Sequence, residues 1–208
     1  MERITSLDDA KKIMGHCFIG PDEICKCKKL SLIIPDTLPD IKFRQEDLEA
    51  KKEDYLLILG LSFLKDGKPV SVRSFLDLFG NDPVLQEPCF YNQDWYLKES
   101  FIDSTLQTDW FMIRKSVFDD SRAKMPDVLE KDCSFPTTIQ CVYAFFVAWL
   151  CLGEKLWWHD FVWCNDRDHN GDRIYVGKYH DVDGVNKNGF SIHRHLSLRP
   201  CYGAINYF

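Results

Sequence analysis

The sequence lacks the short motifs that mark the large enzyme families. It contains no GxSxG elbow, no GxxxxGK[ST] phosphate loop, no GxGxxG turn and no HExxH helix. The adjacent acids Asp119 and Asp120 would point apart, and the neighbours His16 and Cys17 are typical of the end of a short first helix. These absences remove the usual grounds for expecting an enzyme, although they leave an activity open.

Long apolar runs and basic stretches are also missing. The most apolar run, Cys141–Leu152, has twelve residues, whereas a membrane-spanning helix needs about 20. The first ten residues, MERITSLDDA, are charged and contain no apolar leader, so we expect neither a secretory signal nor a membrane segment. A net charge of −6 without clustered Lys and Arg argues against nucleic acid as a partner.

Cysteine is present, but its arrangement does not suggest disulfides. The nine cysteines are odd in number and irregularly spaced, which together with the missing leader predicts reduced thiols and a cytoplasmic location. Cys25 and Cys27 are the closest pair, and the single residue between them is not the usual zinc spacing.

The chain length of 208 residues suits one domain with a smaller N-terminal companion. We expect an N-terminal accessory unit over residues 1–87 and a second unit over residues 88–208, with the boundary in Gly80–Gln93. Capping residues and apolar periodicity predict helices at Ser6–Gly15, from Pro21, Gln45–Asp54, Ser71–Gly80 and Thr137–Gly153. Apolar runs predict strands at Tyr55–Phe63 and Trp110–Ser116.

The last quarter of the chain, Trp157–Phe208, holds five of the six histidines and three of the six tryptophans. Its β-type runs are Asp160–Cys164, Arg173–Tyr179, Phe190–Leu196 and Tyr202–Phe208. Helices followed by antiparallel strands predict an α+β fold. Polar and aromatic residues gathered on short turns indicate a recognition surface. Trp149 and Trp163 are expected in the core, and one of Trp157 and Trp158 at a partly exposed rim.

The segment Asp166–Asp172 allows two interpretations. Asp166, Asp168, Asn170 and Asp172 occupy the first oxygen positions of a calcium loop, with Gly171 at the sixth position. Position twelve of that loop is Gly177 instead of glutamate, and the flanks read as strands. A hairpin with Asn170 and Gly171 in a type I′ turn is therefore favoured. We expect no cofactor, while calcium at this loop stays an alternative.

The histidines of the last strand could also bind a metal. His193 and His195 lie on one face of a strand, because side chains repeat every second residue. They would need a third ligand, for which His180 and Asp181 are nearest in sequence. Binding of a polar ligand is favoured over a metal, because Arg194 and Arg199 are close by.

Several segments together resemble a known family. DWFMIRKSVFDDSRAK (109–124), PTTIQCVYAFFVAWLCLGEKLW (136–157) and the later GDRIYVGKYHDVDG and FSI segments are similar, in this order, to bacterial C-type-lectin-like proteins. These are related to the variable proteins of diversity-generating retroelements, whose fold is shared with formylglycine-generating-enzyme-like domains. The resemblance covers roughly residues 88–208.

The resemblance implies a C-type-lectin-like antiparallel sheet, packed on helices, whose last hairpins bind a ligand. It places the ligand-binding residues within Asn186–Cys201, and the candidates there are Asn186, Asn188, His193, His195 and Arg199. The stretch RHLSLRPCYGAINYF is poor in the Asn, Tyr, Asp and Ser of diversified segments, which suggests a fixed ligand. The cysteine pair and metal residues of the enzymatic relatives have no match.

We therefore expect a non-enzymatic recognition protein that binds a protein or a glycan through its C-terminal hairpin loops. One alternative is a metal-dependent enzyme that uses the Asp166–Asp172 loop with His193 and His195. Another is a structural subunit of a phage or mobile element. As surface residues, His193 and Arg199 are expected to tolerate alanine with a loss of about 0.5 kcal/mol or less.

Overall fold

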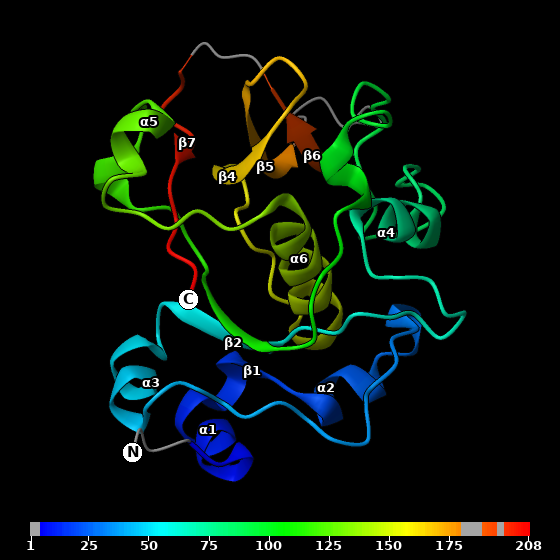
Figure 1. Cartoon of the computed structure of the whole chain (residues 1–208), viewed down its shortest axis with the longest axis vertical. Coiled ribbons are helices and arrows are strands. Elements are labelled where there is room, and N and C mark those ends of the chain that lie inside the picture. Colours follow the sequence, from blue (N-terminus) through cyan, green and yellow to red (C-terminus); the bar gives the residue numbers. More distant parts are fainter. Residues whose placement is uncertain (1–4, 180–188, 195–197) are drawn as a thin grey trace.

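A computed structural model describes residues 5–179, 189–194 and 198–208. The protein is α+β, with two mixed sheets on either side of one long helix (Figure 1). The helices are α1 (Leu7–Met14), α2 (Pro21–Lys26), α3 (Gln45–Lys51), α4 (Val72–Phe79), α5 (Pro126–Leu129) and α6 (Thr138–Leu152). Short 3-10 turns are η1 (Gly15–Cys17), η2 (Lys28–Leu30), η3 (Ser100–Asp103) and η4 (Asp119–Ser121). The strands are β1 (Phe18–Ile19), β2 (Tyr55–Leu59), β3 (Trp110–Arg114), β4 (Phe161–Arg167), β5 (Arg173–Tyr179), β6 (Gly189–His193) and β7 (Tyr202–Gly203).

The first sheet has the order β1-β2-β3, with β1 parallel and β3 antiparallel to β2. All five residues of β2 are buried, as expected for a strand covered on both faces. The end of the chain returns to this sheet. The amide N–H of Phe208 donates to the Met112 carbonyl at 3.0 Å, and the Met112 amide donates back at 2.9 Å. The C-terminal residues therefore connect the second half of the chain to the first sheet.

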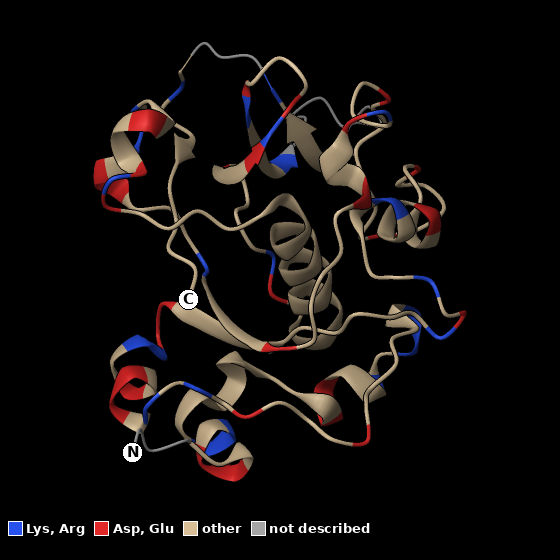
Figure 2. Cartoon of the chain, in the orientation of Figure 1, with Lys and Arg blue, Asp and Glu red and all other residues tan. Residues whose placement is uncertain are grey.

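Helix α6 lies between the two sheets (Figure 1). It carries no charged residue, whereas α1 and α3 carry both signs (Figure 2). Thr137 and Gln140 form a capping box at its start, and Gly153 ends it in the left-handed conformation. The Tyr143 hydroxyl donates to the Leu59 carbonyl at 2.8 Å. A helix without charged residues, most of whose side chains are buried, fits a position inside the core.

The second sheet has the order β6-β5-β4-β7 and buries both of its faces. Because side chains alternate along a strand, each face has its own set of residues. The face toward α6 belongs to the main core and includes Val162, Cys164, Ile174, Val176, Phe190 and Ile192. The outer face forms a second cluster with Phe161, Trp163, Tyr175, Tyr202, Leu129, Phe135 and Ala204.

The expected helices, and the strands expected at Tyr55–Phe63, Trp110–Ser116, Asp160–Cys164 and Arg173–Tyr179, are confirmed with ends shifted by a few residues. The strand expected at Tyr202–Phe208 is wrong in its length, because β7 covers only Tyr202–Gly203. The strand expected at Phe190–Leu196 is confirmed up to His193, and its last two residues lie outside the described residues. Trp163 and Trp157 are buried, while Trp149 and Trp158 are partly exposed, so Trp158 is the expected rim residue. Trp149 still packs against the main core. Within the described ranges no helix combines the length and apolar character that crossing a membrane would require.

The structure bears on the predicted boundary at Gly80–Gln93 through shared packing. β2 belongs to the expected unit 1–87 and β3 to the unit 88–208, yet they pair over five residues. One core cluster also runs from Ala10 to Ile205. The expected units therefore share a sheet and a core, and whether either folds alone stays a prediction.

Candidate functional site

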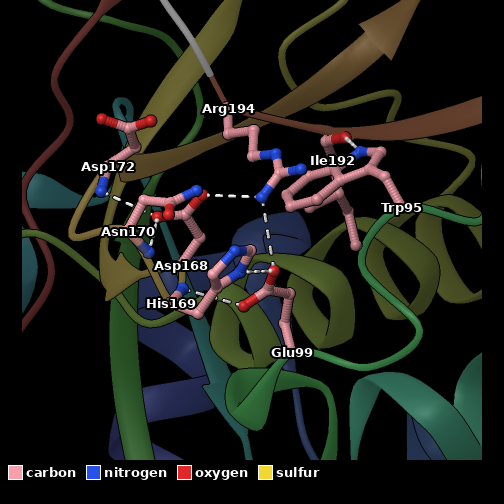
Figure 3. A network of polar contacts seen from close by, with 8 residues as sticks. All are labelled: Trp95, Glu99, Asp168, His169, Asn170, Asp172, Ile192 and Arg194. Atoms are coloured by element: carbon pink, nitrogen blue, oxygen red, sulfur yellow. Dashed lines mark hydrogen bonds and ion pairs between the residues drawn. The ribbon is translucent and has the colours of Figure 1, made fainter.

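Three segments meet at one end of the second sheet: the loop before and at the start of η3, the β4–β5 turn, and the end of β6 (Figure 3). The turn is built by Asp168. Its Oδ1 accepts the backbone N–H groups of Asn170 at 2.9 Å and Asp172 at 2.8 Å. This is the local side-chain-to-backbone bonding that makes Asp a turn residue. The hairpin favoured from the sequence is thus confirmed.

The turn type expected from Asn170 and Gly171 is wrong. A type I′ turn needs positive φ at both central residues, but Gly171 has a φ of 86° and Asn170 is not in the positive region. The connection between β4 and β5 instead has five residues, and the Asp168 carboxylate determines its shape. The sequence signal for a hairpin was sound, but it did not reveal that a side chain would organise the turn.

A charge network links the three segments (Figure 3). Arg194, just after β6, donates from Nη1 to Asp168 Oδ2 at 2.8 Å and to Glu99 Oε1 at 3.4 Å. The Glu99 carboxylate also accepts from His169, from Nδ1–H at 2.6 Å and from the backbone N–H at 2.9 Å. Both carboxylates are buried, with side-chain exposures of 0% for Asp168 and 6% for Glu99. The network therefore holds two buried acids around one guanidinium.

Trp95 supports the guanidinium of this network. The Arg194 Cζ lies 4.6 Å from the centre of the Trp95 ring, within the range of a cation–π contact. The indole N–H of Trp95 donates to the Ile192 carbonyl at 3.1 Å, which fixes the ring beside β6. An arginine that stacks and bonds at the same time loses little further freedom when a ligand arrives. We call Trp95, Glu99, Asp168, His169 and Arg194 the tip network.

The contacts in the tip network favour the ionised form of Asp168. Burial raises the pKa of Asp168, but the hydrogen bond from Arg194 and the two backbone N–H groups outweigh it, so the pKa is lowered overall. The carboxylate is thus held as an anion by three donors. At the rim the His169 side chain is 65% exposed, so part of its imidazole ring is accessible from outside.

The tip network also contains potential metal ligands. Among the described residues, Glu99, Asp168 and His169 place one ligand atom each within 4.8 Å of one another. Arg194 already lies against both carboxylates. The expected calcium loop is arranged differently, because Asp166 accepts the backbone N–H of Thr138 at the start of α6. Calcium through Asp166, Asp168, Asn170 and Asp172 stays a prediction that no contact in the described ranges favours.

Of the ligand-binding residues expected from the resemblance, Asn186, Asn188 and His195 lie outside the described residues. His193 ends β6 and is partly buried. Its ring stacks on Tyr175 at 5.4 Å between centroids and meets Phe161 edge-on at 5.4 Å. Arg199 is exposed. The structure therefore places one expected residue against the outer aromatic cluster and one at the surface.

The environment of His193 disfavours its charged form. Burial and the nearby Arg199 charge lower its pKa to about 4. The Gln93 side-chain N–H donates to Nδ1 at 3.4 Å, so the matching tautomer carries its proton on Nε2. That Nε2 is enclosed and has no hydrogen-bond partner in the described part of the chain. The tolerance to alanine expected of a surface residue therefore applies to Arg199 and no longer to His193.

Sequence reasoning noticed Arg194 only as a neighbour of the expected residues, and it missed Trp95 and Glu99. These two lie in a stretch without helical or alternating periodicity, between residues 88 and 107. Their neighbours in the network are 70 to 99 residues away in sequence. The only local signal in the sequence is the spacing of four positions between Trp95 and Glu99, and an aromatic residue and an acid at this spacing are too common to indicate a site.

Comparison with known proteins adds no relative. No protein-family model matches the chain, and no curated protein or solved structure shows significant similarity to it. The resemblance to C-type-lectin-like proteins therefore rests on the sequence segments quoted above.

Proposed function

We propose that this protein is a non-enzymatic recognition protein that binds a protein or a glycan at the end of its second sheet. The binding surface would combine the rim of the tip network with Arg199 and the residues that follow β6. The C-type-lectin-like fold, as the more specific form of the α+β architecture, is part of the same proposal. It agrees with a long helix packed behind a sheet whose last strands lead into the surface.

The observation that carries the proposal is that the buried charges of the tip network fix the positions of the exposed residues around it. The guanidinium of Arg194 forms ion pairs with the buried carboxylates of Asp168 and Glu99. These ion pairs connect η3, the β4–β5 turn and the end of β6. Such a frame presents exposed groups in a fixed geometry, which lowers the entropy lost on binding. The exposed groups are His169, Asn170 and Arg199.

The chemistry of these groups suits hydroxyl-rich or peptide ligands. Imidazole and amide groups both donate and accept hydrogen bonds, the planar guanidinium group donates them, and a half-buried indole adds apolar area. The net charge of −6 with no basic stripe continues to argue against nucleic acid. A glycan or a protein loop with hydroxyl and carboxylate groups fits best.

The test is a binding screen of the full chain on a glycan array and a displayed peptide library. Each hit is then measured with His169→Ala and Arg199→Ala, with Arg44→Ala as the matched control. Arg44 is an exposed arginine that pairs with Asp47 beside α3, on a different part of the molecule. We expect a loss of roughly tenfold or more in affinity for the two rim variants and none for the control. The proposal would be contradicted if the wild type and all three variants bound every hit with equal affinity.

A metal-dependent activity is the second candidate, because Glu99, Asp168 and His169 cluster closely. Replacing Arg194 by Gln removes the internal cation while keeping a hydrogen-bonding side chain. If the cluster is a metal site, this variant should bind Mn²⁺, Zn²⁺ or Ca²⁺ more tightly than the wild type in calorimetry, and Asp168→Asn should abolish binding. Absence of binding in both proteins would remove this candidate.

A further inference from the structure

A second charged cluster lies at the far end of β5 from the tip network. Lys178, on the face of β5 that looks toward α6, is only 2% exposed. Its Nζ lies 3.9 Å from the Trp158 ring centre and 5.5 Å from the Trp149 ring centre. The Nζ of Lys155 approaches the same two rings, at 4.5 and 4.9 Å. Two ammonium groups therefore converge on one pair of indoles.

Neither ammonium group has an acceptor in the described part of the chain. No ion pair or hydrogen bond involves Lys155 or Lys178, and neither has an interaction with the residues that are not described. Each ammonium carries three N–H donors, and a ring face satisfies only part of them. Lys178 is almost wholly buried as a residue, but its Nζ is not one of the fully enclosed polar atoms. The ammonium group at the end of a buried stem therefore stays open to solvent or to a ligand.

The surrounding charges do not balance the pair. Glu87 is exposed and acts on Lys178 only from a distance, while Lys155 repels it. Cys89 is a further nearby titratable group. Burial is the main cause that lowers the pKa of Lys178. The C-terminal end of α6 favours nearby cations through its partial negative charge, but it supplies neither amine with a hydrogen bond. Two like charges at one place therefore remain without a partner.

The turn that carries Trp158 is conformationally strained. Trp157 and His159, on either side of it, have φ angles of 49° and 70°. Non-glycine residues seldom adopt such angles, and they persist where surrounding contacts hold them. Here the Trp157 indole N–H donates to the Arg114 carbonyl at 3.2 Å. The backbone of Trp158 forms an isolated parallel β-bridge with that of Lys178. This turn places the Trp158 ring over the two amines.

We propose that Lys155 and Lys178, held against Trp149 and Trp158, bind a compact oxyanion, either a phosphate or a carboxylate group of a small ligand. The indoles hold one side of each ammonium, and the remaining N–H donors converge on the anion. Lys178 provides the buried contact and Lys155 the exposed one, so the anion enters from the Lys155 side. This site goes beyond the proposed recognition surface and does not depend on it.

The test is calorimetric titration of the full chain with inorganic phosphate, sulfate and acetate at constant ionic strength. We expect one site with millimolar or tighter affinity for at least one anion. Lys178→Met, which keeps the aliphatic stem, should weaken binding by roughly 30-fold or more, because it removes the buried partner of the anion. Lys155→Gln should weaken it by roughly fivefold to tenfold.

The control is Lys131→Gln, which removes an exposed lysine elsewhere and should leave the affinity unchanged. Thermal melting gives a second readout. The bound anion should raise the melting temperature of the wild type and of Lys131→Gln, but not that of Lys178→Met. A preference for phosphate and sulfate over acetate would identify a phosphate-type ligand, and the reverse a carboxylate.

Two results would overturn the proposal. One is a wild type that binds none of the three anions at millimolar concentration. The other is binding that survives Lys178→Met unchanged while the variant melts cooperatively. Because glycan and peptide binding are measured at the other end of β5, failure here leaves the recognition proposal standing.

Discussion

Two charged clusters lie at opposite ends of β5, and they differ in how their charges are balanced. In the tip network, Arg194 lies against two carboxylates, and every buried oxygen of Asp168 has a donor. In the Lys155–Lys178 cluster, two amines share two indoles, and no acid among the described residues forms an ion pair with them. A balanced buried cluster acts as a frame, whereas an unbalanced one favours a partner from outside. Charged residues near one end of β5 thus stabilise the structure, and those near the other end are proposed to bind a ligand.

The comparison predicts effects of opposite sign on stability. Asp168→Ala removes one partner of a buried pair and the acceptor of two backbone N–H groups. We expect the free energy of unfolding to fall by ~3–5 kcal/mol, measured by urea denaturation. Asp168→Asn keeps the turn acceptor and should lose about half as much, so a measurement remains if the alanine variant fails to fold.

The matched control for this prediction is Asp127→Ala. Asp127 pairs with Arg167, but both side chains are exposed, by 66% and 45%. Surface pairs contribute little, so the loss should be below ~1 kcal/mol. Equal losses at Asp127 and Asp168 would mean that the tip network is not a frame.

His193 adds a pH dependence beside the tip network. Its folded pKa of about 4 lies below the ordinary histidine value of 6.5, so the unfolded chain takes up the proton first as the pH falls. Stability is therefore complete above pH 6.5 and declines toward pH 4. The decline should be about 2 kcal/mol, less than the full shift implies, because the ring is only partly buried.

The variant that tests this is His193→Phe, which keeps an aromatic ring on Tyr175. Denaturation curves at pH 7 and pH 4.5 compare it with the wild type. The variant should lose less stability between the two pH values. A pH dependence that is identical in both proteins would show that His193 does not titrate as its surroundings suggest.

Lys178→Met should act in the opposite direction to Asp168→Ala. It replaces an amine that no described residue pairs with, at the end of a buried stem, by an apolar side chain of similar length. This should raise the free energy of unfolding by ~1–2 kcal/mol without any anion. The folded protein holds the pKa of Lys178 below 10.5, so the charged amine destabilises the fold at neutral pH. This cost disappears as the pH rises toward 10.5, and the stability gained by Lys178→Met should therefore shrink in alkaline buffer. A destabilised variant at neutral pH would mean that Lys178 is satisfied in the protein.

The smallest expected effect is on the stability of Arg199→Ala. Arg199 is exposed, and its loss should change the free energy of unfolding by ~0.5 kcal/mol or less. It should change binding at the tip surface much more. A large loss of stability would place Arg199 in the packing of the outer aromatic cluster and remove it from the proposed surface.

Much of the local structure followed from the sequence. The capping box at Thr137 and the stop at Gly153 located α6, because capping groups are decided by residues within one turn. The run Tyr55–Phe63 was identified as a doubly buried strand from its apolar residues alone, and the strand forms over Tyr55–Leu59. The Asp166–Asp172 segment was identified as a hairpin, although its turn type was not. These features depend on neighbours in the chain.

The two charged clusters did not follow from the sequence, for a physical reason. Trp95, Asp168 and Arg194 come from three segments, and nothing in a local pattern shows that they meet. Likewise, Lys178 lies on the inner face of β5 together with Ile174 and Val176. In the sequence it cannot be distinguished from an ordinary polar residue of a strand. The Asp166 side chain looked like a calcium ligand until its bond to the start of α6 was visible.

The sequence by itself determined which of the longer segments become helices and strands, and which of them are apolar enough to be buried. Those properties arise from backbone preferences and from side-chain periodicity over a few residues. Only the tertiary structure decided which charges lie together and whether they are satisfied, because burial and partner choice depend on residues far apart in the chain. The difference between the balanced cluster at Asp168 and the unbalanced one at Lys178 is therefore a property of the fold.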